Sequence, residues 1–377
     1  MTEELLTEDC KMKIIIASIT DSGIYRGRRE FISQLIREGH NVAIVSPRTN
    51  AVEKLKGLGC NHIEVHIQRH GMNPAEELKL IHDYWKILKA NKPDIVFSFT
   101  IKPNLYLGIL CRIMEIPYAM NITGLGEGLM HEGKTKKILL KLYPIATKRV
   151  RCIFFQNVFN RQFFVEHKLA DSKVFKMLPG SGVNINNFTP IDYPDEKEGL
   201  RFLFVSRIVK DKGIDELIEA IKRIKEKYDY VDFHFVGGCD EVYEKKLPEW
   251  KSEGLIIYHG RVEPDEMIKY YGMMHCLIHP SYHEGMANVI LESGACARPS
   301  IASDINGCKE GIDDEITGYV FKLKSVDELT DRIERFINLS HHDKVNMGLM
   351  ARKKMEREFD RQIVTNAYME VVKDVGR

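Results

Sequence analysis

Short, almost wholly apolar runs alternate with helix-patterned stretches along nearly the whole chain. Residues 13–19 and 42–46 are the first such runs, and the alternation starts afresh at residues 201–206 and 231–236. Strands that are apolar at nearly every position are covered by helices on both faces, as in parallel sheets. The sequence therefore predicts an α/β fold with two Rossmann-like parallel-sheet domains that face a cleft. Ligands are expected beyond the carboxyl ends of the strands.

The polar segment 190–199 interrupts the alternation. It holds two prolines and no periodicity, as linkers do. The acidic start of the chain lacks the basic and apolar regions of a signal peptide, and no apolar run reaches the ~18–20 residues that span a bilayer. We expect a loose tail over residues 1–11 and a first domain over residues 12–189. The linker 190–199 is followed by a second domain over residues 200–355. Residues 356–377 are expected to form a helix that crosses back to the first domain.

Charge is divided unevenly between the two halves. Residues 1–190 hold 27 Lys and Arg against 18 Asp and Glu, a net charge of +9, while residues 191–377 hold 28 against 36, a net charge of −8. A basic unit joined to an acidic one indicates separate tasks, with the basic unit meeting something anionic. The eight cysteines are scattered singly without a Cys-x2-Cys pair, which favours a reduced, cytoplasmic chain over a zinc site.

Two strand ends carry features of phosphate binding. Gly23 follows the first strand, where a single glycine lets backbone N–H groups approach an anion, although a plain turn explains it as well. Arg207 ends the first strand of the second domain, and Lys212 follows just before a helix. Arg can hold a phosphate with two hydrogen bonds and Lys adds a point charge. A solvated basic turn is the alternative.

Residues 280–292 hold the strongest signal. Glu284 is expected just before a helix and Glu292 eight residues later, a spacing that returns a side chain to nearly the same helical face. Both carboxylates could then line one wall of the cleft, while the first-turn N–H groups of Gly285, Met286 and Ala287 meet a phosphate. Two solvent-facing glutamates are the alternative, which the apolar surroundings of the segment disfavour.

These features together resemble glycosyltransferase family 4, whose members are retaining, nucleotide-sugar-dependent enzymes of the two-domain GT-B fold. The resemblance rests on Glu284-x7-Glu292, on Arg207 with Lys212, and on the turns 237–238 and 260–262. In the first half, three segments resemble the branch that builds bacterial capsule, O-antigen or N-glycan precursors: residues 98–104, 121–126 and 178–184. That branch includes enzymes that add a sugar, often N-acetylgalactosamine, to an undecaprenyl-diphosphate-linked saccharide.

The resemblance implies a role for each matching residue. Arg207 and Lys212 would hold the donor diphosphate and offset charge on the departing nucleotide. Glu284 would hold hydroxyls of the transferred sugar, so that these three residues form the expected catalytic set. The remaining donor contacts would come from Glu292 on the ribose, from Arg261 and Val262 beside the base, from Gly238, from the backbone of Gly285, Met286 and Ala287, and from Gly23 near the phosphate.

The family requires no metal or other cofactor, and no Asp-x-Asp occurs in this sequence. Retaining glycosidases place two carboxylates about 5 Å apart, whereas eight residues of helix separate Glu284 from Glu292 by roughly 12 Å. The resemblance therefore implies front-face transfer, in which the leaving phosphate helps to take the acceptor's proton. Many members carry a His where this chain has Thr123, so no general base is assigned there.

The acceptor side is expected in the first domain. Tyr25, Arg28, Arg69 and Lys102 are predicted in loops after strands, where they and Thr123 could bind an acceptor diphosphate, although solvated cations explain each one equally well. Residues 134–151 hold seven basic residues and no acidic one, interleaved with apolar side chains. Such a helix suits an anionic membrane surface, with a core-packed helix as the alternative. No stacking or base-reading motif indicates nucleic acid.

We therefore expect a retaining glycosyltransferase that moves a sugar from a UDP-sugar to an undecaprenyl-diphosphate-linked saccharide, peripheral on the inner face of the plasma membrane. Two alternatives stay open. A GT-B sugar-nucleotide epimerase shares the fold and the nucleotide, and needs acid and base residues across the cleft. A non-catalytic sugar-nucleotide-binding protein has no reason to keep all of Arg207, Lys212, Glu284 and Glu292. The donor sugar, and the choice of UDP or GDP, stay open.

Overall fold

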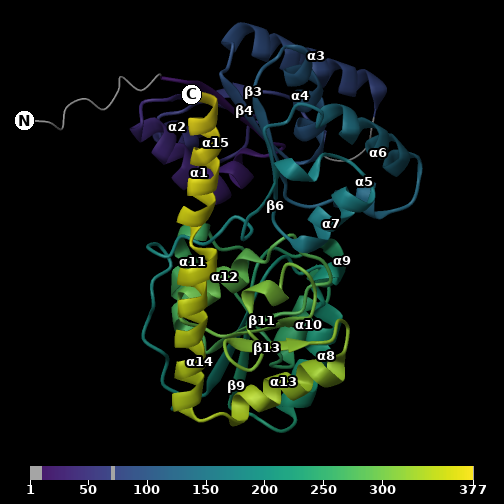
Figure 1. Cartoon of the computed structure of the whole chain (residues 1–377). Coiled ribbons are helices and arrows are strands. Elements are labelled where there is room, and N and C mark those ends of the chain that lie inside the picture. The colour runs from purple at the N-terminus through teal and green to yellow at the C-terminus, as the bar shows by residue number, and fades with distance from the viewer. Residues whose placement is uncertain (1–10, 69–72, 377) are drawn as a thin grey trace, which may run out of the picture. The chain divides into compact units, whose positions relative to one another are not determined.

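The computed structural model describes residues 11–68 and 73–376. The chain divides into two compact units, Met1–Ser181 with Gln362–Arg377, and Gly182–Arg361 (Figure 1). The loose tail expected over residues 1–11 lies outside the described residues except for Lys11. The boundary between the units falls at Ser181 and Gly182, ahead of the segment 190–199 where the sequence analysis placed a linker.

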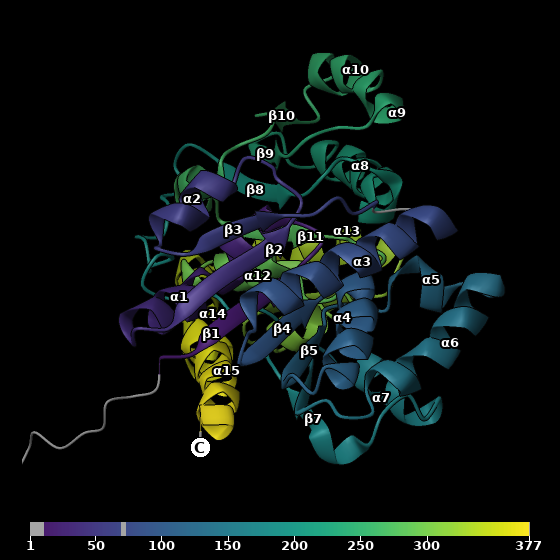
Figure 2. The same ribbon diagram turned by 90° about the horizontal axis from the view of Figure 1, so that it is seen from above.

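The first unit is built on a seven-stranded sheet in the order β3-β2-β1-β4-β5-β6-β7, and every strand pair is parallel (Figure 2). Its strands are β1 (Lys13–Ala17), β2 (Asn41–Ser46), β3 (Asn61–Glu64), β4 (Ile95–Phe99), β5 (Tyr118–Ile122), β6 (Cys152–Phe155) and β7 (Phe175–Met177). Its helices are α1 (Asp21–Arg37), α2 (Val52–Gly57), α3 (Pro74–Asn91), α4 (Ile101–Ile113), α5 (Gly126–Met130), α6 (Lys134–Ala146), α7 (Val158–Glu166) and α15 (Arg361–Gly376).

Helices cover both faces of this sheet. In β1, Ile14 and Ile16 point into the core that α1, α2 and α15 complete, whereas Ile15 and Ala17 point into the core under α3, α4, α6 and α7. The alternation follows from the two-residue period of a strand. The last helix, α15, belongs to the first unit, where Tyr368 packs against Phe31 and donates a hydrogen bond of 2.6 Å to Oδ1 of Asn121.

The second unit has a six-stranded parallel sheet in the order β10-β9-β8-β11-β12-β13. Its strands are β8 (Leu200–Val205), β9 (Val231–Val236), β10 (Ile257–Tyr258), β11 (Cys276–His279), β12 (Ser300–Ser303) and β13 (Gly318–Phe321). Its helices are α8 (Ile214–Lys225), α9 (Glu241–Glu244), α10 (Leu247–Ser252), α11 (Met267–Met273), α12 (Asn288–Ala295), α13 (Val326–Asn338) and α14 (His341–Lys354). The prediction of two parallel α/β sheets is confirmed.

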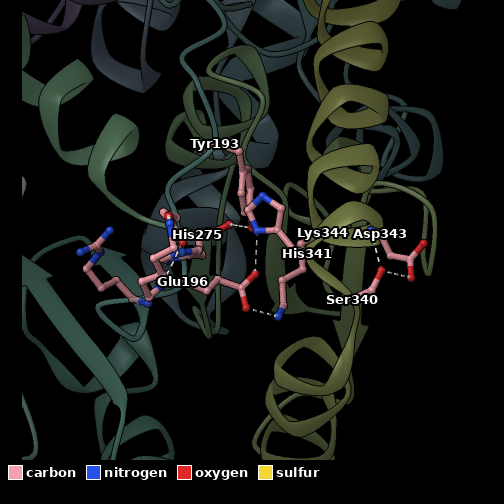
Figure 3. A network of polar contacts seen from close by, with 10 residues as sticks. Tyr193, Glu196, His275, Ser340, His341, Asp343 and Lys344 are labelled. Carbon is pink, nitrogen blue, oxygen red and sulfur yellow. Dashed lines mark hydrogen bonds and ion pairs between the residues drawn. The ribbon is translucent and has the colours of Figure 1, made fainter.

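The segment expected as a linker is held by the second unit. Arg298 is 1% exposed, and its guanidinium donates to the carbonyls of Ile191 and Asp192 at 3.0 and 2.7 Å. Glu196 accepts hydrogen bonds from Lys344 at 2.9 Å and from His341 at 3.1 Å (Figure 3). Charged hydrogen bonds to buried groups are strong, so residues 191–196 are fixed to this unit.

Candidate functional site

The donor-side residues predicted from the sequence gather at one edge of the second sheet. All strands of this sheet run parallel, so their carboxyl ends meet at the same edge. The loops that leave this edge hold Arg207 after β8, Gly238 after β9, Arg261 and Val262 after β10, Glu284 after β11 and Gly307 after β12. The edge is therefore where a ligand of this unit is expected.

Glu284 accepts two hydrogen bonds on one carboxylate oxygen. Nζ of Lys212 lies 2.5 Å from Oε1, and Nε2 of His279 lies 2.9 Å from the same atom. The side chains of Lys212 and Glu284 are 17% and 16% exposed, while that of His279 is 3% exposed. Oε2 takes no hydrogen bond from the residues that the structure describes, so one oxygen of a partly buried carboxylate remains available to a ligand.

The electrostatic surroundings keep Glu284 ionised. Burial raises the pKa of its carboxyl group, but the hydrogen bonds and charges of His279 and Lys212 outweigh it and lower the pKa to about 2. At neutral pH the carboxylate can therefore only accept hydrogen bonds. This suits a group that holds sugar hydroxyls and excludes a general acid.

The loop that carries Glu284 is pressed against the start of α8. The hydroxyl of Tyr282 donates to the carboxylate of Glu216 at 2.7 Å, and the N–H of Tyr282 donates to the carbonyl of Asp211 at 2.8 Å. Gly213 has a φ of +68°, and a Cβ there would lie 2.1 Å from the carbonyl oxygen of Pro280. Only glycine fits this contact, which brings Lys212 to Glu284.

The other side of the same loop meets the turn after β12. Gly307 has a φ of +90°, and a Cβ there would lie 2.7 Å from the carbonyl oxygen of Glu284. The N–H of Ala287 donates to the carbonyl of Gly307 at 2.7 Å. The backbone of Glu284 is thus held from two sides, and its carboxylate is presented in a fixed place.

Two helix-based predictions for this segment are wrong. Helix α12 begins at Asn288, so Gly285, Met286 and Ala287 precede it and do not form its first turn. Glu284 lies outside the helix as well, so it does not share a helical face with Glu292. The N–H of Ala287 is already bonded to Gly307, and we therefore remove Ala287 from the backbone donors.

Glu292 lies on α12 and has its own partner. The hydroxyl of Tyr271 donates to Oε2 of Glu292 at 2.8 Å. Tyr271 is 1% exposed on α11, and burial raises the pKa of its phenol well above the ordinary value. A tyrosine that stays protonated remains a hydrogen-bond donor, so it fixes one oxygen of Glu292 much as Lys212 and His279 fix one oxygen of Glu284.

The turns after β9 and β10 are joined. The N–H of Gly237 donates to the carbonyl of Gly260 at 2.8 Å, and a Cβ at Gly237 would lie 1.8 Å from the carbonyl oxygen of Ser206. Ile208 donates to the carbonyl of Gly238 at 2.8 Å, which ties this turn to the loop that holds Arg207. Arg207 and Arg261 are exposed and Val262 is partly buried, all at the same sheet edge.

The ammonium group of Lys212 already has partners within the protein. Its ammonium group forms the ion pair with Glu284 and lies 3.3 Å from Oγ of Ser281. A phosphate bound by Lys212 must therefore share this cation with Glu284.

In the first unit the structure corrects the placement of three predicted acceptor residues. Tyr25 and Arg28 lie within α1 and Lys102 lies in the first turn of α4, so none is in a loop. Arg28 is 4% exposed, and its guanidinium lies 4.8 and 5.3 Å from the ring centroids of Phe99 and Tyr368. A buried cation in this position serves the core, and we remove Arg28 from the acceptor contacts.

The other residues predicted in the first unit differ in their burial and in their hydrogen-bond partners. Nζ of Lys102 lies 2.5 Å from the carboxylate of Glu77. Gly23 is exposed in the first turn of α1, where its N–H donates to Oγ1 of Thr20 at 3.0 Å. Thr123 follows β5 and is partly buried. Arg69 lies outside the described residues.

The basic segment 134–151 begins with α6. Leu139, Tyr143 and Ala146 of this helix are buried in the core of the first unit. Its exposed side combines cations and apolar side chains, namely Lys134, Lys137, Ile138, Lys141 and Ile145. Among the described residues, no helix is long and apolar enough to cross a bilayer.

Comparison with known proteins identifies the family. The model described as glycosyl transferases group 1 matches residues 190–354, and the model described as glycosyl transferase 4-like matches residues 15–157. An uncharacterized glycosyltransferase of Methanocaldococcus jannaschii is 31% identical over 257 residues, which are 67% of this chain and 68% of that protein. The chain belongs to the glycosyltransferases.

A second relative of this glycosyltransferase is similar over nearly its full length. It is the N,N'-diacetylbacillosaminyl-diphospho-undecaprenol alpha-1,3-N-acetylgalactosaminyltransferase of Campylobacter jejuni, which is 25% identical over 377 residues and aligns over 96% of this chain and 98% of its own.

Solved structures show that the fold is GT-B. A glycosyltransferase of Rickettsia africae superposes with a TM-score of 0.81 at 22% identity, covering 97% of this chain and 99% of that one. HepE of Anabaena, solved in complex with UDP and glucose, superposes with a TM-score of 0.78 at 16% identity, covering 96% and 100%. The expected GT-B fold of this glycosyltransferase is therefore confirmed.

Sequence reasoning missed several residues that support the site of this glycosyltransferase. His279 reads as part of an apolar strand, and Tyr271 lies in an unremarkable helix, so only the folded chain brings them to Glu284 and Glu292. His234 in β9 and His259, which follows β10 two residues before Arg261, form a hydrogen bond of 2.9 Å. Within the described ranges, no group of three or more His, Cys, Asp or Glu residues could hold a metal ion.

Proposed function

We propose that this glycosyltransferase is a retaining enzyme of family 4 that transfers a sugar from a UDP-sugar to a lipid-linked saccharide. The observation that carries the proposal is the cluster of Lys212, His279 and Glu284 at the carboxyl edge of the second sheet. It combines a cation suited to a diphosphate with an ionised carboxylate that has one oxygen available for sugar hydroxyls.

Most of the proposed donor contacts lie on the second unit. Arg207 and Lys212 hold the diphosphate, Glu284 holds the transferred sugar, and Glu292, steadied by Tyr271, holds the ribose. Gly238, Arg261 and Val262 flank the base, and the backbone of Gly285 and Met286 lies near the phosphates. The complex of Anabaena HepE with UDP and glucose supports UDP as the nucleotide.

We infer front-face transfer for the chemical step. The partners of Glu284 in the described residues are a lysine and a histidine, and Glu292 is bonded to Tyr271. This arrangement does not place a second carboxylate beside Glu284 as a double displacement requires. The bond from the sugar to the phosphate breaks as the acceptor hydroxyl approaches the same face, the leaving phosphate takes the hydroxyl proton, and Arg207 and Lys212 stabilise the negative charge that develops on the diphosphate.

The acceptor is proposed to be an undecaprenyl-diphosphate-linked saccharide. The support is the activity named for the Campylobacter relative, together with the net charge of +9 in residues 1–190 of this chain. Gly23 stays a candidate for contact with the donor phosphate, while Tyr25, Arg69, Lys102 and Thr123 stay candidates for acceptor contacts.

A peripheral position on the inner face of the plasma membrane follows from the acceptor. The exposed side of α6 offers three lysines beside Ile138 and Ile145. Each cation near an anionic leaflet contributes about 1 kcal/mol of binding free energy, and the two apolar side chains can enter the headgroup region.

The test is product formation from purified components. The enzyme, UDP-N-acetylgalactosamine and an undecaprenyl-diphosphate-linked saccharide should give a lipid product heavier by one N-acetylhexosamine in mass spectrometry, with the α-configuration of the donor retained in its NMR spectrum. Arg207→Ala should form little product. Inversion at the anomeric carbon would contradict the retaining mechanism, and a free epimerised sugar nucleotide without acceptor would identify an epimerase instead.

A further inference from the structure

His279 is a buried histidine whose ring forms one hydrogen bond with the described residues. It lies at the end of β11 and is 2% exposed. Nε2 reaches Oε1 of Glu284 at 2.9 Å, whereas Nδ1 is buried and finds no partner in the described residues. A buried polar atom without a partner is costly, so a leucine or valine would suit this strand better if the side chain served the core alone.

The protonation of the carboxylate fixes the tautomer of the imidazole. Glu284 is ionised at neutral pH and Oε1 can only accept. Nε2 must therefore carry the proton, and a neutral ring leaves Nδ1 as a bare lone pair. A second proton on Nδ1 would place a buried N–H where the described residues offer it no acceptor.

Lys212 and His279 approach the same oxygen of Glu284, which leaves Oε2 without a protein donor among the described residues. The two donors differ in mobility. The lysine ends a flexible chain that a diphosphate can attract away, while the imidazole is fixed in a strand of the sheet. When Lys212 turns toward a phosphate, His279 still holds Oε1.

We propose that His279 is a positioning residue that anchors Oε1 of Glu284, so that Oε2 is presented to the hydroxyls of the transferred sugar. This inference rests on the proposed function of the site. It predicts that His279 affects the sugar part of donor recognition and not the binding of the nucleotide diphosphate.

A matched pair of variants separates the hydrogen bond from the packing of the ring. His279→Leu removes the donor, and His279→Gln keeps an amide N–H at about the reach of Nε2. For wild type and both variants, the affinities for UDP and for UDP-N-acetylgalactosamine are measured by calorimetry, with melting temperatures as the record of folding. His279→Leu should weaken UDP-N-acetylgalactosamine about tenfold relative to UDP, as the loss of a charged hydrogen bond predicts, and His279→Gln should recover most of the loss.

Failure of the inference and failure of the proposed function have different signatures. If the wild type binds neither ligand, or binds UDP-N-acetylgalactosamine no more tightly than UDP, the proposed donor is wrong, and this role of His279 falls with it. If the wild type prefers the nucleotide sugar and His279→Leu keeps that preference, the positioning role alone is overturned.

A spectroscopic measurement tests the contact without a ligand. In histidine labelled with nitrogen-15, the signals of His279, assigned by their absence from His279→Gln, should show a proton on Nε2 and should shift in Glu284→Gln. An Nε2 without a proton, or no response to Glu284→Gln, would contradict the proposal.

Discussion

Lys212 and Glu284 form an ion pair of 2.5 Å across two loops of the second sheet. The pair joins the end of the loop after β8 to the loop after β11, and the close approach of Gly213 to Pro280 brings the two loops together. In an ion pair that is mostly buried, removing one partner leaves the other charge uncompensated. In the proposed donor site, a bound diphosphate would therefore compete with Glu284 for the same ammonium group, and this competition would link the recognition of the phosphates to that of the sugar.

Glu284→Gln should change UDP binding and sugar transfer in opposite directions. The neutral amide releases Lys212 to the diphosphate, so the affinity for UDP should rise a few fold. Transfer should fall at least about a hundredfold, because an amide offers a weaker acceptor than a carboxylate in a site where charge-assisted hydrogen bonds dominate. Calorimetry with UDP and a product assay measure the two effects. An unchanged transfer rate would remove Glu284 from the site.

Tyr271→Phe should weaken UDP binding through Glu292. The variant removes the hydroxyl that donates to Oε2 of Glu292, which lowers the free energy of unfolding by about 1–2 kcal/mol and leaves the carboxylate less fixed. The affinity for UDP should fall a few fold in calorimetry. Tyr243→Phe is the matched control, since its hydroxyl bonds Asp215 at 3.0 Å on a different helix. Equal effects of both variants would show that Glu292 does not depend on Tyr271 for ligand binding.

The stability of the second unit should fall as the pH drops below about 6.5, in part through His275. This residue is fully buried, its Nδ1 accepts a hydrogen bond from the N–H of Arg201, and burial lowers its pKa to about 4. In the unfolded chain the imidazole of His275 binds a proton near pH 6.5, whereas in the folded chain it does so only near pH 4. Its contribution to the free energy of unfolding is therefore fully present above pH 6.5 and is lost as the pH falls toward 4.

His275→Asn keeps an acceptor near Arg201 and removes the titration. Urea unfolding at pH 6.5 and pH 5 should show about 1.5 kcal/mol less loss of stability in this variant than in the wild type, because the unfolded histidine is already half protonated at pH 6.5. His131→Asn replaces an exposed histidine and serves as the control. Parallel pH profiles of the wild type and His275→Asn would contradict the assignment.

Charge reversal on α6 should weaken membrane binding without touching the donor site. Lys137→Glu with Lys141→Glu exchanges two exposed cations for anions, and at about 1 kcal/mol for each charge near the surface the affinity for phosphatidylglycerol vesicles should fall more than tenfold. The affinity for UDP should stay unchanged. Lys222→Glu with Lys245→Glu makes the same change of charge on the second unit. Equal loss of vesicle binding in both double variants would indicate a general charge effect and not a binding face on α6.

The sequence predicted the two sheets because strand patterning is local. Residues 13–19 and 201–206 are apolar at nearly every position, and that alone indicates strands covered on both faces. The position of Arg207 and Glu284 at strand ends followed directly from the same pattern. The start of helix α12 at Asn288 could not be predicted in this way. The loop before it is fixed by the hydrogen bond from Ala287 to Gly307 and by that from Tyr282 to Glu216, which form only in the folded chain.

The predictions for Arg28 and for the segment 190–199 differ from the structure because of contacts between residues far apart in the sequence. Arg28 looked like a surface cation, but the sequence does not show that Phe99 and Tyr368, which are far apart along the chain, enclose it. The charged segment 190–199 looked like a linker, although Arg298 and Lys344 hold it through contacts about a hundred residues or more away in sequence. Long-range pairs of this kind leave no trace in local composition.

Titration of UDP into the wild type and Lys212→Met, with and without EDTA, tests the account most directly. The wild type should bind UDP with an affinity that EDTA does not change, and Lys212→Met should lose at least tenfold, equivalent to about 1.4 kcal/mol, because the cation that meets the diphosphate is gone. Binding that Lys212→Met leaves intact, or that EDTA abolishes, would contradict a donor site built on the Lys212 and Glu284 pair.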